Sequence, residues 1–339
     1  MQPIKTQLTE LLGITTPIMS APMGYTWSAD LACAVHKAGG FGLVGAAFDT
    51  SEQLRHTLGR VRTALGVPAG KALPVGVGLV GWVLDQTEAS EDPRIPTVLD
   101  AQPALIYFAF GADLGRHVAA VRAHERGSTH RTLVAVCVST VEEARRAADE
   151  WHADILVAQG FEAGGHSSVD APPVSILVAG VLAALPGGPP VVAAGGVATG
   201  AQAAALLTLG AAGVLLGTRL LFTDECGYTP AQKAAVVRAG HGAAAHAACL
   251  DEVMGLTWPR GVVGHGLVNG VVRDAQEGLP LEERKRRYDE GRAQGDTERL
   301  IVWAGKGVGL TSEIRPAGEV IVQLHEEAVA ALRRAASLL

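Results

Sequence analysis

Short apolar runs alternate along the chain with stretches in which apolar residues recur at helical spacing. The apolar runs are rich in Val, Leu, Ile and Ala and show little alternation with polar residues. Such runs are typical of parallel strands that are covered on both faces. The eight runs that we expect to form strands are residues 17–22, 41–47, 73–80, 104–110, 132–138, 154–160, 190–196 and 213–221.

The stretches between these runs predict the helices of a repeating strand–helix unit. They include residues 29–38, 51–65, 140–151, 174–185 and 199–209. Eight such units close naturally into a (β/α)8 barrel of about 250 residues, so we predict an α/β fold of the TIM-barrel type. An open doubly wound sheet is the alternative. It fits less well because the glycine-rich stretches fall late in the chain rather than after the first strand.

The chain continues well beyond the last expected strand, which ends near Leu221 of 339 residues. A single closing helix needs far fewer residues. We therefore assign residues 1–223 and 301–339 to the barrel, with a last helix at 317–338. The residues in between, 224–300, are expected to form a smaller helical insertion that supplies a lid or contacts to a substrate.

Composition and charge exclude several classes of protein. The chain is 48% hydrophobic, and its formal net charge of −6 offers no basic surface for nucleic acid. Its four cysteines are widely spaced, as expected in a reducing compartment. No signal core or apolar stretch of ~20 residues, as a membrane span needs, is present. We expect a cytoplasmic protein without nucleic-acid or membrane partners, and its oligomeric state, a homodimer included, stays open.

Glycine-rich loops, AAGGVATG and LLGTRL, follow the seventh and eighth expected strands. In barrels of this kind these two loops commonly hold a phosphate group. Gly195 and Gly196 let backbone N–H groups approach an anion, and Thr199 can cap the helix that follows. Gly217 and Thr218 supply a second set of donors. We expect a phosphate site at this end of the barrel.

The stretch QGFEAGGHSS, residues 159–168, follows the sixth expected strand on the same rim. The amide of Gln159 can both donate to and accept from the edge of a ligand ring. Gly164 and Gly165 bring the backbone close to a flat ligand, and His166 would project toward it. A single histidine is more often structural, but this position at the end of a barrel strand makes His166 our catalytic candidate.

The first expected strand runs into APMGYTW at the same rim, where Ala21, Pro22, Met23 and Gly24 can lie against the face of a planar ring. The other histidines carry less weight. His241 and His246 are five residues apart, a poor spacing for one helix face, so we expect no metal site. His265, in the glycine-rich RGVVGHGLVNG, is interpreted as loop structure.

These stretches together resemble the nitronate monooxygenase family, formerly called 2-nitropropane dioxygenases, which are FMN-dependent TIM-barrel enzymes. The resemblance rests on PIMSAPMG (17–24), HKAGGFGLVG (36–45), GVGLVGW (76–82), VAQGFEAGGHSS (157–168), VVAAGGVATG (191–200), GAAGVLLGTRLLFTDEC (210–226) and WAGKGVGL (303–310). It implies an FMN phosphate on Gly195, Gly196, Gly217 and Thr218. It also implies flavin contacts from Met23 and Gln159 and an active-site histidine at 166.

The resemblance further implies oxidation of alkyl nitronates or nitro compounds with dioxygen, through a flavin semiquinone and without NAD(P)H. The partners would be a small-molecule substrate and dioxygen. Two roles stay open for His166. It can abstract an α-proton from a neutral nitro compound, or as imidazolium it can bind the nitronate oxygens.

The chain departs from the family pattern at several positions. Gly78, which we count among the flavin contacts, stands where many relatives have Asn, and Ser167 and Ser168 replace an Arg-Gly or Ile-Gly pair. No lysine occurs between Lys71 and Lys233. A cation that stabilises reduced flavin must therefore be an Arg, a helix N-terminus or Lys306, and the departures leave the substrate open.

Two other functions stay open. Enoyl-acyl carrier protein reductases and NADH:quinone reductases of the same superfamily have nearly the same EAGGH loop, so an NAD(P)H-dependent flavin reductase is the alternative enzyme. A flavin-free barrel that binds a phosphate ligand is the alternative of another class. A phosphosugar isomerase of that class would need a paired acid and base, for which only Glu162 and His166 are candidates.

Overall fold

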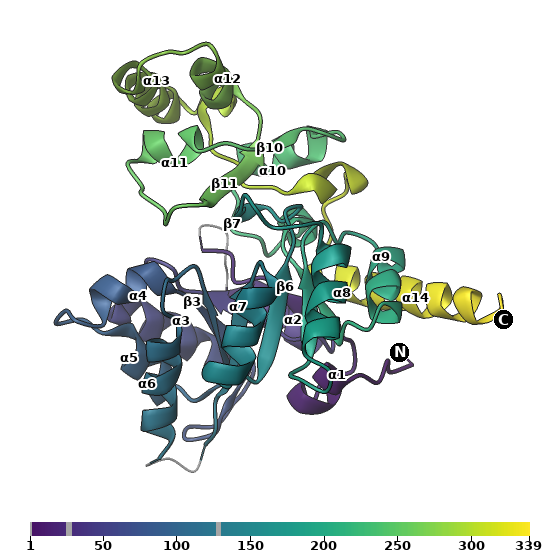
Figure 1. Cartoon of the computed structure of the whole chain (residues 1–339). Coiled ribbons are helices and arrows are strands. Elements are labelled where there is room, and N and C mark those ends of the chain that lie inside the picture. Colours follow the sequence, from purple (N-terminus) through teal and green to yellow (C-terminus); the bar gives the residue numbers. More distant parts are fainter. Residues whose placement is uncertain (1, 25–28, 127–129) are drawn as a thin grey trace.

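Eight strands form one parallel sheet that curls into a barrel (Figure 1). The computed structural model describes residues 2–24, 29–126 and 130–339. The order around the sheet is β1-β9-β8-β6-β5-β4-β3-β2. The strands are β1 (Ile18–Ser20), β2 (Leu43–Gly45), β3 (Leu73–Val80), β4 (Pro103–Ala109), β5 (Leu133–Val138), β6 (Ile155–Gln159), β8 (Val191–Ala194) and β9 (Gly213–Leu216).

β1 and β2, which stand at the two ends of this order, come together next to Phe41. A parallel bridge joins Met19 to Phe41, just before β2, and the backbone N–H of Phe41 donates to the Ile18 carbonyl at 2.9 Å. The sheet is therefore nearly closed, which confirms the predicted (β/α)8 fold and rules out the open doubly wound sheet. Several strands are shorter than expected, and the largest difference is at β9, which was expected to reach residue 221. β9 ends at Leu216 because Gly217, with φ −103° and ψ −86°, turns the chain into a 3-10 helix, η2 (Thr218–Phe222).

Helices connect the strands and cover the outside of the barrel. They are α2 (Ala29–Lys37), α3 (Ser51–Ala64), α4 (Gly81–Thr87), α5 (Arg94–Asp100), α6 (Gly115–Glu125), α7 (Val141–Arg145) with its π-helical continuation η1 (Arg146–Glu150), α8 (Val174–Ala184), α9 (Gly200–Thr208) and α14 (Ala317–Ala336). A short helix, α1 (Gln7–Leu12), precedes β1, and α14 packs against α9. No helix in the described ranges has both the length and the apolar character that crossing a membrane requires.

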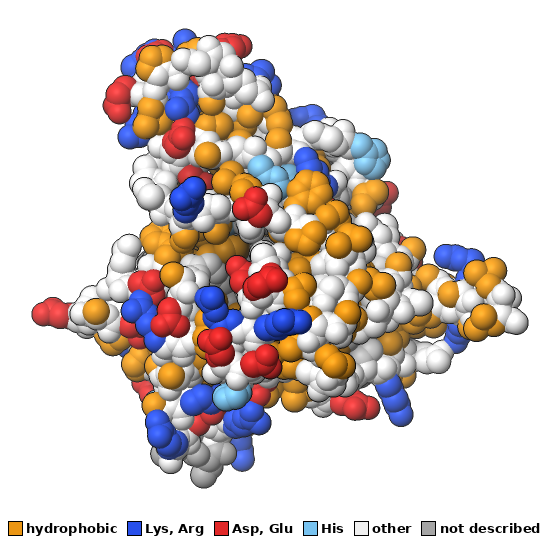
Figure 2. Space-filling model, viewed as in Figure 1, with side chains coloured by type: hydrophobic (Ala, Val, Ile, Leu, Met, Phe, Trp, Pro, Cys, Tyr) orange, Lys and Arg blue, Asp and Glu red, His pale blue; other side chains and the backbone are white. Residues whose placement is uncertain are grey.

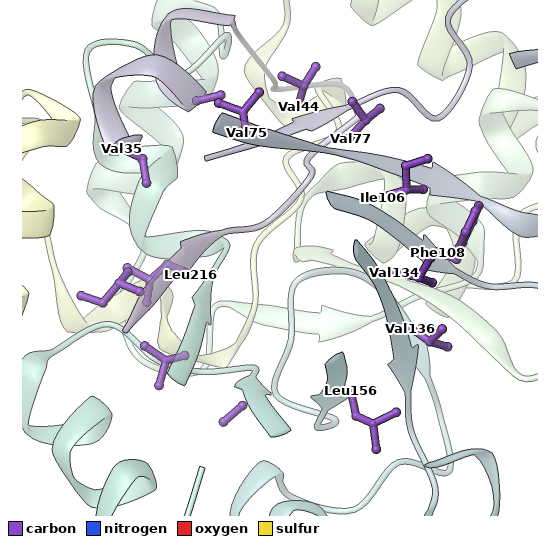
Figure 3. Packing of buried hydrophobic residues seen from close by; sticks show 14 of the residues in the cluster. Val35, Val44, Val75, Val77, Ile106, Phe108, Val134, Val136, Leu156 and Leu216 are labelled. Atoms are coloured by element: carbon purple, nitrogen blue, oxygen red, sulfur yellow. The ribbon is translucent and has the colours of Figure 1, made fainter. Parts of the chain in front are cut away.

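The strands are buried on both faces, as their apolar composition predicts. In β4, Leu105 and Tyr107 point into the barrel, while Ile106 and Phe108 pack against the surrounding helices. Figure 3 shows Ile106 and Phe108 in this outer layer beside Val134 and Val136 of β5. These two layers of apolar contacts hold the strands in place, so that their carboxyl ends form a common rim.

Gly42 marks a position where a helix and a strand lie too close for any side chain. A Cβ on Gly42 would lie 2.1 Å from the backbone oxygen of Ala32 in α2. We expect Gly42→Ala to lower the free energy of unfolding by roughly 1–3 kcal/mol, because backbone must move to relieve the contact. Gly59→Ala is the matched control, because a Cβ there, within α3, meets no atom within 4 Å. Urea unfolding measures both variants, and equal losses of stability would contradict the expected packing.

The segment after β9 forms a lobe above the carboxyl ends of the barrel strands (Figure 1). It contains α10 (Pro230–Arg238), β10 (Ala244–His246), α11 (Cys249–Met254), β11 (Val262–Leu267), α12 (Gly270–Gln276), α13 (Leu281–Gln294) and η3 (Thr297–Arg299), and the 3-10 helix η4 (Lys306–Leu310) follows on the return to the barrel. The expected helices are present. The limits of the insertion, 224–300, stay a prediction.

The lobe also contains strands that the sequence analysis missed. β10 and β11 form an antiparallel sheet with β7 (Gly165–Ser168), in the order β10-β11-β7. β7 is the GHSS part of the loop after β6. The lobe is thus connected by backbone hydrogen bonds to the loop that carries His166.

Candidate active site

A cavity lies between the barrel rim and the lobe, with about 960 Å³ of space that is partly open to solvent. Figure 2 shows hydrophobic side chains gathered where the lobe meets the barrel. Most of the candidate residues from the sequence line this cavity, namely Ala21, Pro22, Met23, Gly24, Gly78, Gln159, Gly164, Gly165, His166, Gly217 and Thr218. Residues 25–28, the rest of the APMGYTW stretch and the residue after it, lie outside the described residues.

Gly195 and Gly196 border a second hollow, which they share with Lys306. The segment at the start of η4 contacts both glycine-rich loops. The backbone N–H of Gly305 donates to Thr218 Oγ1 at 2.9 Å, and Gly307 packs on the carbonyl of Gly196. The two expected phosphate loops therefore meet a common segment, but they face different hollows.

His166 lies in β7, and its ring is held by a carboxylate from the lobe. Its Nε2 is 2.8 Å from Oδ1 of Asp251 in α11, and both side chains are 8% exposed. This hydrogen bond uses Nε2, and Nδ1 makes no hydrogen bond to another of the described residues. The ring stacks on Trp258, with the centroids 3.6 Å apart and the planes at 14°, and Trp303 lies 4.8 Å away. The imidazole is therefore fixed in orientation and keeps one nitrogen free.

Gln159 ends β6 and is also held in place. Its Nε2 donates to the backbone carbonyl of His166 at 3.3 Å, and its Oε1 accepts from Sγ of Cys137 at 3.7 Å. Burial raises the pKa of the Cys137 thiol to about 12, so the thiol stays protonated and can donate. The amide lines the cavity from the carboxyl end of β6, where it can pair with a polar group of a ligand.

His265 is a strand residue rather than the loop residue that we expected. It lies in β11, is completely buried, and its Nδ1 donates to the Ala163 carbonyl at 2.6 Å. Burial, together with the stacked ring of His246 4.0 Å away, lowers the pKa of His265 to about 4. His265 is neutral at pH 7 and fastens the EAGGH loop to the lobe.

Lys306 was one of three open candidates for a cation near the flavin. Its Nζ donates to the Ala244 carbonyl at 2.8 Å, and the residue lines the hollow of Gly195 and Gly196 rather than the cavity of His166. This position suits the phosphate end of a ligand better than its ring.

The family model described as nitronate monooxygenase matches residues 5–327. The chain belongs to the nitronate monooxygenase family. This confirms the resemblance found in the sequence and makes the chain a flavoenzyme of the monooxygenase or oxidoreductase type.

Relatives of known name or structure agree with this family. A nitronate monooxygenase of Neurospora crassa is 30% identical, with 92% of this chain and 88% of the relative covered. The crystal structure of a nitroalkane oxidase from Streptomyces ansochromogenes has a TM-score of 0.77 at 27% identity, covering 97% and 99% of the two chains. FabK from Thermotoga maritima has a TM-score of 0.80 at 24% identity, covering 99% and 100%, and shows the same fold.

The sequence did not predict several residues of this site. Asp251, Trp258 and Tyr228 lie in the insertion, where no motif marks them, and Trp303 lies in a motif that was noted only for the resemblance. Asp251 is 85 residues from His166, so only tertiary packing brings them together. A carboxylate beside a candidate histidine cannot be found from spacing at that separation.

Proposed function

We propose that the chain is an FMN-dependent nitronate monooxygenase, which oxidises alkyl nitronates or related nitro compounds with dioxygen to a carbonyl compound and nitrite. One observation carries the proposal. His166 lies on the wall of the barrel-mouth cavity, with Nε2 bound to Asp251 and Nδ1 left for a substrate. The family match supports the same reaction class.

The residues of the cavity fit a flavin. A Cβ at Gly165 would meet no atom within 4 Å, and one at Gly217 only the Ala21 side chain at 3.7 Å, so the backbone at both positions is open to a flat ligand. Gln159 offers an amide for the ring edge. Gly195, Gly196 and the Lys306 ammonium, which border one hollow, would hold the phosphate tail. FMN, when bound, would supply the redox chemistry.

The protein's own part in the reaction is to move a proton and to bind an anion. When Nε2–H of neutral His166 donates a hydrogen bond to Asp251, Nδ1 presents a lone pair that can take the α-proton of a nitroalkane. The resulting imidazolium is stabilised by the carboxylate and can bind the nitronate oxygens. The two roles left open by the sequence are thus two protonation states of one His–Asp pair.

The test is a visible spectrum of the purified protein, followed by an aerobic assay with propyl-2-nitronate, with and without NADH. We expect flavin absorption bands, release of FMN on denaturation, and equal oxygen uptake and nitrite formation in both assays. A protein that stays colourless after FMN is added would contradict the proposal. So would rapid anaerobic bleaching of the flavin by NADH together with no turnover of the nitronate.

The cytoplasmic location stays a prediction.

A further inference from the structure

Aromatic side chains are concentrated on one side of the cavity. The chain is only 4% aromatic, and 13 of its 15 Phe, Trp and Tyr residues are described, since Tyr25 and Trp27 are not. Five of these 13 form a continuous series of ring contacts that includes His166, and we call them the aromatic wall: Phe48, Trp82, Phe110, Trp258 and Trp303. Four of them line the cavity, and Trp82 packs behind. Aromatic side chains are therefore enriched at this site relative to the chain as a whole.

Trp258 lies at the centre of the aromatic wall. Its ring meets Trp82 edge-to-face at 5.5 Å and 70°, and it meets Phe110 at 5.5 Å and 83°. Phe48 extends the series through Trp82, at 5.9 Å and 63°. Phe48, Trp82 and Phe110 follow β2, β3 and β4 of the barrel, whereas Trp258 comes from the lobe. The lobe thus completes a wall that the barrel begins.

Two polar atoms in the aromatic wall lack partners. The indole N–H groups of Trp82 and Trp258 are buried and have no hydrogen-bond partner within the described ranges. A buried N–H without a partner costs free energy, and an acceptor atom of a bound ligand is one way to satisfy it. Of these two residues Trp258 lines the cavity and Trp82 does not, so a flat apolar ligand with an oxygen acceptor could pack against the aromatic wall and pair with the Trp258 N–H.

We infer that the substrate carries a flat apolar group, aryl or conjugated, beside its nitronate carbon, and that Trp258 determines this specificity. The inference rests on the proposed function and names the substrate class of that same site. Edge-to-face and stacked rings bind aryl groups with a geometric preference that small alkyl groups cannot satisfy. His166 stacks on Trp258, so a ring held by the aromatic wall places an attached nitronate beside the free Nδ1.

Binding is tested first, without turnover, on the flavin-loaded protein. Phenylacetate and propanoate serve as unreactive probes, because a carboxylate has the shape and charge of a nitronate. Quenching of tryptophan fluorescence gives their dissociation constants. We expect phenylacetate to bind roughly tenfold more tightly, and Trp258→Leu to remove most of this difference. Trp151→Phe is the control, since Trp151 lies outside the barrel near Gly115, and it should keep the difference.

Turnover then separates this inference from the proposed function. The nitronates of phenylnitromethane and nitroethane are compared by kcat/KM, and we expect the aryl substrate to be preferred roughly tenfold, mainly through KM. Trp258→Leu should bring the ratio close to one. Turnover of both nitronates without an aryl preference, or a preference unchanged in Trp258→Leu, would overturn the inference alone. If neither nitronate is turned over, the proposed function is wrong. If, in addition, phenylacetate and propanoate bind equally tightly, the inference is wrong as well.

Discussion

Replacing His166 with asparagine should lower the turnover of a neutral nitroalkane by about 10²–10⁴-fold, the usual contribution of a general base. Asparagine cannot accept the α-proton at this position, while its small amide should leave the cavity and the flavin contacts intact. A preformed nitronate has already lost that proton. Its turnover should therefore fall much less, through the loss of the imidazolium charge alone.

The measurement is steady-state nitrite formation from nitroethane and from ethyl nitronate, with bound flavin quantified by its spectrum. His124→Asn is the control, because His124 is an exposed residue of α6 far in the fold from the barrel mouth. It should behave as wild type with both substrates. An unchanged rate of His166→Asn with nitroethane would remove His166 from the mechanism.

Asp251→Asn should lower nitroethane turnover by about 10²–10⁴-fold, although Asp251 itself does not line the cavity. The side chain is 8% exposed and its Oδ1 is 2.8 Å from His166 Nε2. An amide in its place loses the negative charge that stabilises the imidazolium. If the amide donates to Nε2, it also forces the proton onto Nδ1, the nitrogen that would act as base.

This loss should appear in kcat, with KM and the melting temperature nearly unchanged, because the shape of the side chain is kept. Asp289→Asn, at an exposed position of α13 in the same lobe, is the matched control and should change neither constant. Ethyl nitronate should again be less affected than nitroethane. A fall in stability that accounts for the whole loss of activity would show that Asp251 only holds the lobe in place.

The barrel could be predicted because its signal is local. Runs such as residues 104–110 lack polar alternation since both faces of the strand are buried, and this pattern is visible in the sequence. The small sheet of the lobe gave no such signal. β10 is the three-residue stretch AAH and β7 is GHSS, too short and too rich in small or polar residues to show a period.

The rim of the site could be predicted for a similar reason. Glycine-rich stretches directly after apolar runs place Gln159 at the carboxyl end of β6 and Thr218 just after β9, and they bring His166 to the same rim. The residues that surround His166 could not be predicted, because they come from the lobe through tertiary packing. Asp251 and Trp258 stand in local sequences, LDEV and TWPR, that resemble ordinary helix and loop.

The most direct test of the account is a crystal structure of the protein purified with its own flavin. We predict an FMN with its isoalloxazine ring in the barrel-mouth cavity, between Met23 and Gln159, and its phosphate at Gly195, Gly196 and Lys306. Nδ1 of His166 should face the space above the ring. An isoalloxazine bound elsewhere, or an imidazole turned away from it, would contradict the account.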